Sequence, residues 1–196
     1  MKWLFLVAFA YLLGSVPVGI LVSRFFGGED PRDAGSGNIG ATNVARTLGR
    51  LPGIVTLVGD VLKGFVPALW AAQAFSSPWA VATVGLAAFL GHVFPLYIGF
   101  KGGKGVATGL GVFLALAPGS ALLAACVFGA VVWKWRIVSL ASLSAAAALP
   151  LLAGFLGRPA AIVFLAAVVA GVTAWKHQGN IERLMEGTES RLGEKR

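Results

Sequence analysis

The chain has 196 residues, of which 57% are hydrophobic and only 12% are charged, and its mean hydropathy is +0.82. Soluble domains average about 25% charged residues, so this composition excludes an ordinary soluble domain and indicates an integral membrane protein. The net charge of +8 does not indicate nucleic-acid binding, because the lysines and arginines cluster in short segments between apolar runs, as topology signals do. We therefore expect no nucleic-acid partner.

Apolar runs recur along the chain, and crossing the ~30 Å hydrocarbon core of a bilayer requires about 20 helical residues. The first run continues past residue 14 without a small-residue cleavage site, so it predicts a retained helix instead of a signal peptide. Because the runs account for most of the length, we expect one all-α membrane domain over residues 1–196. The runs lie near residues 3–26, 54–75, 79–99, 105–133, 137–156 and 159–176.

The run over residues 105–133 is too long for one straight helix. Ala117-Pro118-Gly119 interrupts it, and a proline followed by a glycine bends or ends a helix. The sequence therefore predicts two short helices, 105–117 and 119–133, for a total of about seven transmembrane helices. Because helices this short barely span a bilayer, a re-entrant pair is the alternative.

Charge placement favours seven helices over six. With the N-terminus outside, the segments after the first, third, fifth and seventh helices share the cytoplasmic side, and these segments carry most of the lysines and arginines. Lys2 and Arg158 are the exceptions. The C-terminal tail is then cytoplasmic, and the re-entrant alternative leaves this sidedness unchanged.

The first polar motif is GSGNIGATNVAR, residues 35–46. Its glycine-rich backbone can curl into a nest of N–H groups that holds a phosphate, and Thr42 or Asn43 could cap a short helix that ends at Gly49. A helix N-terminus at this place would favour anions further, whereas the alternative is a flexible turn-forming loop. The candidate residues are Gly35, Ser36, Gly37, Asn38, Gly40, Thr42, Asn43 and Arg46.

The second polar motif is FKGGKGVAT, residues 100–108. Two lysines framed by glycines can approach a phosphate closely, although the spacing does not match a Walker A motif. The alternative is a pair of lysines that only sets topology. The candidate residues are Lys101, Gly102, Gly103, Lys104, Gly105 and Thr108.

The third polar motif is HQGNIERLMEGTE, residues 177–189, directly after the last apolar run. His177 and Asn180 would share a face if the helix continued, although Gly179 weakens that expectation. A lone interfacial histidine is often only solvated. Pairs of Arg183 with Glu182 or Glu186 are interpreted as ordinary surface pairs.

Asp60 and Lys63 are charged residues inside the second apolar run. Charged residues inside a membrane span are energetically costly, so they first suggest a function. The i, i+3 spacing equally allows a structural ion pair near the cytoplasmic end of the helix. His92 precedes Pro95 and is interpreted as a structural hydrogen-bonding histidine. Two histidines far apart, one cysteine and scattered carboxylates form no metal-ligand pattern, so we expect no metal.

Together the three motifs resemble those of the bacterial membrane glycerol-3-phosphate acyltransferases that use acyl phosphate, the PlsY family. GSGNIGATNVAR matches the first family motif, GHVFPLYIGFKGGKGVAT the second and HQGNIERLMEGTE the third, and the resemblance covers essentially the whole chain. It implies a multi-pass protein of the bacterial inner membrane with a cytoplasmic active site. The implied reaction moves a fatty acyl group from acyl phosphate to the sn-1 hydroxyl of glycerol 3-phosphate and gives lysophosphatidic acid and phosphate, the first step of phospholipid synthesis.

The resemblance also implies residue roles. Ser36 and Arg46 would be essential in the first motif, His177 and Asn180 would serve catalysis, and Glu189 would serve structural integrity. Lys101, Gly102, Gly103, Lys104 and Gly105 would bind glycerol 3-phosphate. No cofactor, acyl carrier protein or coenzyme A would be required directly. One departure is Gln178, which stands where family members commonly carry an arginine.

An acyl phosphate is a mixed anhydride with a good leaving group, so the protein must mainly orient the hydroxyl, take its proton and stabilise the oxyanion. We hypothesise direct attack, with Ser36 and backbone N–H groups holding acyl phosphate while Arg46, Lys101 and Lys104 neutralise the phosphates. His177 would be the base or would orient substrate while a phosphate oxygen takes the proton. A covalent acyl-Ser36 intermediate is the alternative.

Two other classes of function compete with this one. A transporter or channel for phosphate or a phosphate ester would need polar side chains across the bilayer, which the last two apolar runs almost lack, and no inverted repeat is evident. A scaffold that binds membrane lipid would need basic loops but not the glycine and asparagine pattern. The oligomeric state is left open.

Overall fold

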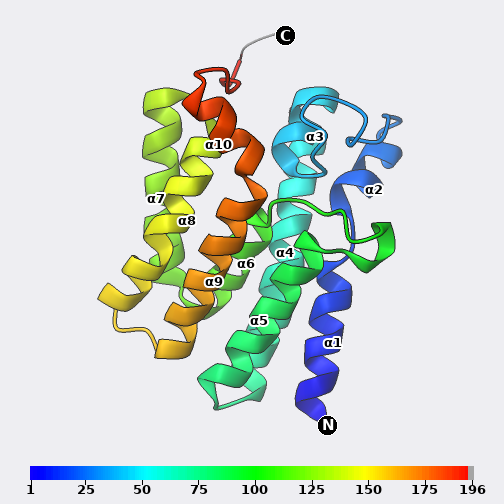
Figure 1. Cartoon of the computed structure of the whole chain (residues 1–196). Helices are drawn as coiled ribbons and strands as arrows, with labels where there is room; N and C mark the ends of the chain where they lie inside the picture. Colours follow the sequence, from blue (N-terminus) through cyan, green and yellow to red (C-terminus); the bar gives the residue numbers. More distant parts are fainter. Residues whose placement is uncertain (194–196) are drawn as a thin grey trace. The chain divides into compact units, whose positions relative to one another are not determined.

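The computed structural model describes residues 1–193, and within that range it contains ten α-helices, one short 3-10 helix and no strand (Figure 1). Contacts divide the chain into two compact units, Met1–Leu116 and Ala117 onward. The expectation of a single domain over residues 1–196 stays a prediction. The predicted all-α membrane class is confirmed by these helices and by the solved relatives described below.

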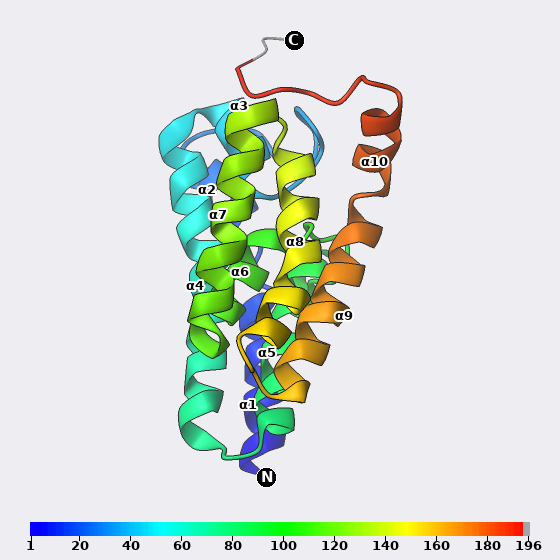
Figure 2. The ribbon, with the colours of Figure 1, turned by 90° about the vertical axis from the view of Figure 1, so that its left-hand side faces the viewer.

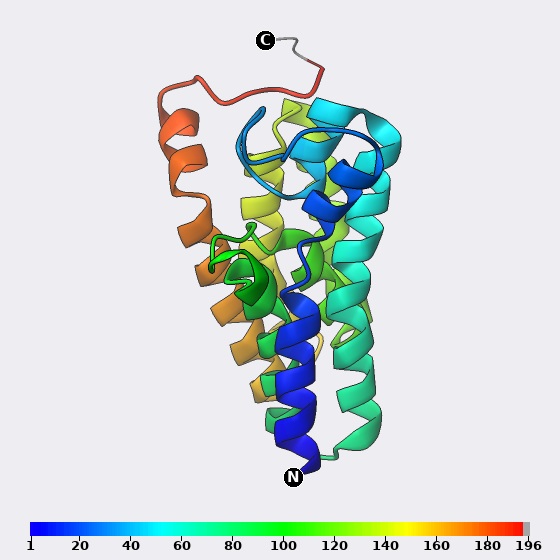
Figure 3. The same ribbon diagram turned by 90° about the vertical axis from the view of Figure 1, so that its right-hand side faces the viewer.

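The first unit contains six α-helices and the 3-10 helix. Their bounds are α1 (Lys2–Gly14), α2 (Val18–Phe25), α3 (Ala41–Leu48), α4 (Arg50–Ala74), α5 (Pro78–Val93), η1 (Leu96–Ile98) and α6 (Val106–Leu116). Helix α4 packs against α1, α2, α3, α5 and α6, and Figure 3 shows α1 beside it. This long helix is therefore the centre of the unit that carries the first two polar motifs.

The second unit contains four α-helices. Their bounds are α7 (Pro118–Trp135), α8 (Val138–Phe155), α9 (Ala160–Lys176) and α10 (Gln178–Met185). Helices α7, α8 and α9 pack in sequence order, as Figure 2 shows. Arg136 adopts the left-handed conformation between α7 and α8, and its carbonyl accepts a hydrogen bond from the N–H of Leu192. The segment that follows α10 is thereby hydrogen-bonded to the turn between α7 and α8.

Four described helices are long and apolar enough to cross a membrane, namely α4, α5 extended through η1, α7 and α8. The bent pairs α1 with α2 and α9 with α10 bring the number to as many as six, and α6 is a shorter apolar helix. The described residues thus provide four to six candidate spans, and the expected total of about seven stays a prediction that would need α6 to be counted as well. The orientation, with the N-terminus outside and the C-terminus cytoplasmic, stays a prediction.

The predicted continuous helix over residues 3–26 is wrong, because α1 ends at Gly14 and α2 begins at Val18 with a bend of 41° between them. Pro17 lies in the break, lacks a backbone N–H and sits directly before α2, where that N–H is not needed. The division of residues 105–133 is confirmed, since α6 ends at Leu116 and α7 begins at Pro118.

Glycines let the helices of the first unit approach closely. A Cβ atom at Gly14 would overlap the carbonyl oxygen of Ala88 where α1 crosses α5, and one at Gly64 would overlap the carbonyl oxygen of Thr108 where α4 meets α6. Small residues at crossings are the usual means of packing helices in membranes. This packing fixes α5 and α6, which flank the second polar motif.

Candidate active site

Asn43 organises the loop that carries the first motif. Its side chain is 2% exposed, and its Nδ2 group donates hydrogen bonds to the carbonyl oxygens of Pro31 (2.7 Å), Ala34 (3.0 Å) and Asn38 (2.9 Å). Its Oδ1 atom accepts a hydrogen bond from the backbone N–H of Ser36 at 2.8 Å. The amide therefore uses its donor and acceptor capacity to hold the loop in one shape.

The predicted helix after this loop exists, but its predicted cap is wrong. Helix α3 begins at Ala41 with Gly40 as the N-cap, and neither Thr42 nor Asn43 occupies that position. Asn43 cannot cap the helix because its side chain is committed to the loop carbonyls. The predicted end at Gly49 is confirmed, and the φ of +97° at this residue is one that glycine adopts readily.

Ser36 lies between two glycines in the left-handed region, Gly35 with φ of +61° and Gly37 with φ of +68°. A Cβ atom at Gly35 would overlap Oδ1 of Asn43, so this position needs glycine for its dihedral angle and for space. The N–H groups of Ser36 and Gly37 donate within the loop, to Oδ1 of Asn43 and to the carbonyl oxygen of Ala34, so the predicted nest of open N–H groups is not formed by these two residues. The side chains of Ser36 and Arg46 are exposed at this loop and on α3.

Other predicted residues of the first motif take supporting positions. Asn38 accepts a hydrogen bond from the N–H of Gly40 at 2.9 Å, whereas Thr42 is exposed on the first turn of α3. Ile39 and Val44 are buried at 3% and 0% exposure and attach the loop to the unit. At the start of α3 the N–H groups of Asn43 and Val44 donate to the carbonyl oxygen of Gly40, so the N–H groups of Ala41 and Thr42 are the ones with no partner within the helix.

The second motif packs against the end of α5. The N–H of Gly103 donates to the carbonyl oxygen of His92 at 3.2 Å, and a Cβ atom at Gly103 would overlap Nε2 of the same histidine. A Cβ atom at Gly102 would overlap the His92 carbonyl, and one at Gly105, where φ is +82°, would overlap the ring of Phe89. All three glycines thus permit close contact between the loop and α5.

The lysines of this loop remain at or near the surface. Lys101 is exposed and Lys104 is half-buried. Thr108 is fully buried in α6, where its methyl group faces Gly64 of α4, so its role in substrate binding stays a prediction. In Figures 1 and 3 the loop of residues 26–40 lies at the α3 end of α4, and the loop of residues 99–105 lies farther along the unit.

A buried polar cluster joins three of the residues that the sequence singled out. The ammonium group of Lys63 lies 2.8 Å from Oδ1 of Asp60, and Nδ1 of His92 lies 3.4 Å from the same oxygen. Lys63 also donates a hydrogen bond to the carbonyl oxygen of Val16 at 2.8 Å. The i, i+3 pair that the spacing allowed is therefore present, and it extends to α5 and to the break before α2.

The third motif begins at a bend between helices. Helix α9 ends at Lys176, α10 begins at Gln178, and the two helices meet at 63°, so the helix does not continue straight through His177. Nδ1 of His177 lies 2.7 Å from the carbonyl oxygen of Thr173. Because a carbonyl only accepts, Nδ1 carries the hydrogen, and in a neutral imidazole Nε2 then bears the lone pair that can take a proton.

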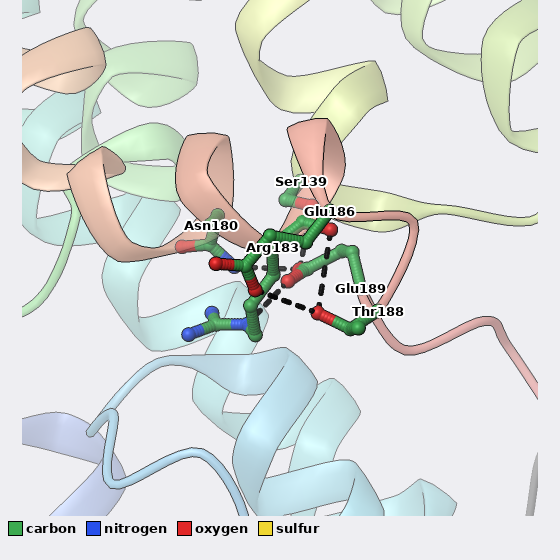
Figure 4. A network of polar contacts seen from close by, with 6 residues as sticks. All are labelled: Ser139, Asn180, Arg183, Glu186, Thr188 and Glu189. Atoms are coloured by element: carbon green, nitrogen blue, oxygen red, sulfur yellow. Dashed lines mark hydrogen bonds and ion pairs between the residues drawn. The ribbon is translucent and has the colours of Figure 1, made fainter.

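Glu189 holds the rest of this motif together (Figure 4). Its carboxylate accepts hydrogen bonds from Oγ of Ser139 (2.7 Å), Nδ2 of Asn180 (2.6 Å) and Nε of Arg183 (2.6 Å). Burial by itself raises the pKa of Glu189, but these hydrogen bonds and the Arg183 charge outweigh burial and hold the pKa below its usual value. The carboxylate also fixes which end of the Asn180 amide faces it.

This network corrects one interpretation and adds one residue. Arg183 forms its ion pair with Glu189, at 2.6 Å, and the predicted surface pairs with Glu182 and Glu186 are wrong, because the chain turns back after α10 and brings Glu189 to the arginine. Ser139 was missed. It lies in the first turn of α8, and no local pattern in the sequence links it to a residue fifty positions away.

The described residues therefore provide three kinds of chemistry. The first motif offers a hydroxyl and a guanidinium, and the second offers two ammonium groups. The third motif offers a buried imidazole whose Nδ1 is held by a carbonyl and an amide held by a carboxylate. Hydroxyl activation and charge neutralisation of phosphate esters require groups of these types.

Comparisons with known proteins agree with this chemistry. The family model described as glycerol-3-phosphate acyltransferase matches residues 4–187. A glycerol-3-phosphate acyltransferase of Geobacter sulfurreducens is 54% identical over 96% of this chain and 97% of its own, and one of Aquifex aeolicus is 47% identical over 98% of this chain and 100% of its own.

Solved structures give the same result. A crystal structure of PlsY (YgiH), described as an integral membrane glycerol 3-phosphate acyltransferase in the glycerol 3-phosphate form, is 45% identical, with a TM-score of 0.95 over 98% of this chain and 96% of that one. The lysophosphatidic acid form has a TM-score of 0.93, with 44% identity and the same coverage. A family model over nearly the whole chain, relatives near 50% identity and this structural likeness show that the chain belongs to the glycerol-3-phosphate acyltransferase family of integral membrane enzymes.

Proposed function

We propose that this protein transfers a fatty acyl group from acyl phosphate to the sn-1 hydroxyl of glycerol 3-phosphate, and that it does so at the cytoplasmic face of a bacterial inner membrane. Family membership supports the acceptor and the product, as do the solved relatives, of which one is a glycerol 3-phosphate form and the other a lysophosphatidic acid form. The same membership disfavours a transporter or channel.

The observation that carries the donor assignment is the exposed Ser36 in a loop that is held in one shape. A loop fixed by Asn43 presents the hydroxyl of an exposed serine, which can donate to a phosphoryl oxygen, and the exposed Arg46 on α3 adds a positive charge. We assign this loop to the phosphoryl part of acyl phosphate, where the Ser36 hydroxyl and the Arg46 guanidinium also stabilise charge on the departing phosphate.

A second phosphate-bearing substrate requires a second cationic site. Lys101 and Lys104 lie on a loop whose glycines are pressed against α5, so their backbone is held in place while their side chains reach the surface. We assign this loop to the phosphate of glycerol 3-phosphate. Lysine suits that role because its compact ammonium group interacts strongly with phosphate oxygens.

The chemical step is attack by the glycerol oxygen on the acyl carbonyl carbon. A carbon–oxygen bond to glycerol forms, the bond between the acyl carbon and the bridging phosphate oxygen breaks, and phosphate leaves with the electron pair. Nε2 of His177 takes the hydroxyl proton, while Asn180, held by Glu189, orients the acceptor. Phosphate is a good leaving group, so direct transfer needs no covalent enzyme intermediate.

Purified protein supplied with either acyl phosphate or acyl-CoA, together with labelled glycerol 3-phosphate, tests this proposal. Lysophosphatidic acid should form from acyl phosphate and not from acyl-CoA. Absence of product with both donors would contradict the enzyme function, and product from acyl-CoA alone would contradict the donor.

Variants then test the assigned roles. Arg46→Ala should raise KM for acyl phosphate, and Lys104→Ala should raise KM for glycerol 3-phosphate. A rapid burst of phosphate release together with labelled acyl-Ser36 would show that the reaction proceeds through a covalent intermediate instead of direct transfer.

A further inference from the structure

The cluster of Asp60, Lys63 and His92 is set among apolar helices. These residues are 1%, 5% and 3% exposed, and they come from α4 and from the last turn of α5, both of which are apolar enough to cross a membrane. Burying charged groups there is costly, and apolar residues of similar size often give equal or greater stability. Stability alone therefore does not explain why this cluster is present.

One side of the cluster holds the break between α1 and α2. Lys63 donates to the carbonyl oxygen of Val16 at 2.8 Å, next to Pro17, at a place where the helix has ended and carbonyl groups lack their helical partners. Lys63 is in turn held by Asp60 at 2.8 Å. The ion pair thus secures α4 in one position along the unit.

The other side of the cluster reaches the lysine-bearing loop. His92 lies with Nδ1 3.4 Å from Asp60, and Gly103 packs directly against the Nε2 edge of the same ring. The main-chain carbonyl of His92 also accepts the N–H of Gly103 at 3.2 Å. The carbonyl and the ring of His92 therefore both limit where Gly103 can lie, and Lys104 is the next residue.

We propose that Asp60, Lys63 and His92 are positioning residues for the acceptor. They act through Gly103 to hold Lys104 where it binds the phosphate of glycerol 3-phosphate, and they touch neither substrate. The inference rests on the proposed assignment of the lysine-bearing loop to glycerol 3-phosphate. It predicts that disturbing the cluster weakens acceptor binding selectively and leaves donor binding in place.

The main test variant is the double substitution Asp60→Leu/Lys63→Met. It removes both charges together, so no unpaired charge stays buried and the variant is expected to fold. We expect KM for glycerol 3-phosphate to rise about tenfold while KM for acyl phosphate stays within about twofold. Thr56→Val is the matched control, because Thr56 is fully buried on the same helix and its hydroxyl donates to the carbonyl oxygen of Pro52 one turn away.

A folded double variant with both KM values unchanged, or with both raised alike, would overturn the inference. If the double variant does not give monodisperse protein, His92→Gln, which keeps the ion pair, is judged by the same criterion. Equal selectivity in Thr56→Val would also overturn it, since any buried change in α4 would then have the same effect.

The Lys104→Ala variant distinguishes a failure of this inference from a failure of the proposed function. If Lys104→Ala leaves KM for glycerol 3-phosphate unchanged, the assignment of the loop is wrong. If Lys104→Ala raises this KM and the cluster variants do not, only the positioning role fails. In the Lys104→Ala background, the cluster substitution should add less than about twofold, because both changes remove one interaction. Full additivity would contradict the inference.

Discussion

Asp60 and Glu189 each gather several polar side chains, but they do so in opposite surroundings. Asp60 lies within α4 and meets two groups that carry or can carry positive charge, Lys63 and His92, at almost complete burial. A charge in that position persists because it is paired. Removing one partner leaves the other buried without compensation.

Glu189 lies beyond α10, where the chain has left the apolar helices. It receives three hydrogen bonds, and its ion-pair partner Arg183 keeps 41% of its side chain exposed. Water can therefore replace part of what is lost when this network is disturbed. The comparison teaches that a substitution in the Asp60 network should mainly lower the stability of the fold. A substitution in the Glu189 network should mainly change the orientation of Asn180.

Asp60→Ala should show the largest effect on stability. We expect a loss of about 3–5 kcal/mol in the free energy of unfolding, because Lys63 would stay buried without its counter-charge. Denaturant unfolding in detergent measures this, and the double substitution Asp60→Leu/Lys63→Met should lose much less. If Asp60→Ala were as stable as the unchanged protein, the claim that the buried Asp60 network controls stability would be wrong.

Glu189→Gln should affect turnover more than stability. The glutamine keeps the size of the side chain but presents an NH2 group to its donors, so Asn180 loses its fixed orientation, and kcat should fall about 10- to 100-fold. Steady-state kinetics measure this, with the exposed Glu182→Gln as the matched control. Unchanged kcat would show that Glu189 does not position the site.

Ser139→Ala should have a smaller effect. It removes one hydrogen bond to a carboxylate that keeps two others, and we expect a loss of about 1 kcal/mol in unfolding free energy and only a few-fold loss in kcat. Ser142→Ala is the matched control, because the Ser142 hydroxyl donates to the carbonyl oxygen of Val138 within its own helix. A loss for Ser139→Ala as large as that for Glu189→Gln would contradict the shared network.

The pH dependence of stability should show the smallest effect, in a narrow range. The pKa of Glu189 is lower in the folded protein than its ordinary value of 4.5. Its contribution to stability is therefore present above pH 4.5 and is lost as the pH falls through the lowered pKa. The difference in unfolding midpoint between the unchanged protein and Glu189→Gln should become smaller as the pH is lowered. A difference that grows on acidification would contradict the predicted direction of the pKa shift.

The sequence predicted features that one or two residues decide locally. Pro118 marks the division between α6 and α7, and Gly49 marks the end of α3, because each residue restricts or frees the backbone at its own position. The break at Pro17 was missed because the apolar character continues on both sides of it, and hydropathy averaged over a run does not detect a local bend.

Features that depend on the chain turning back on itself were harder to predict from the sequence. Arg183 was paired with acidic neighbours in its own helix, whereas the turn after α10 brings Glu189 to it. Asn43 was interpreted as a cap or ligand, whereas a folded loop uses its amide as an anchor. The residue types of the candidate site could be predicted, but their division into anchors and exposed groups required the three-dimensional contacts.

The central claim is that acyl phosphate and glycerol 3-phosphate react directly with each other on this protein. Simultaneous measurement of phosphate release and lysophosphatidic acid formation by the purified protein tests it most directly. The account predicts that one phosphate is released for each lysophosphatidic acid formed and that phosphate release depends on glycerol 3-phosphate. Phosphate release at the same rate without the acceptor, or without lysophosphatidic acid as product, would contradict it.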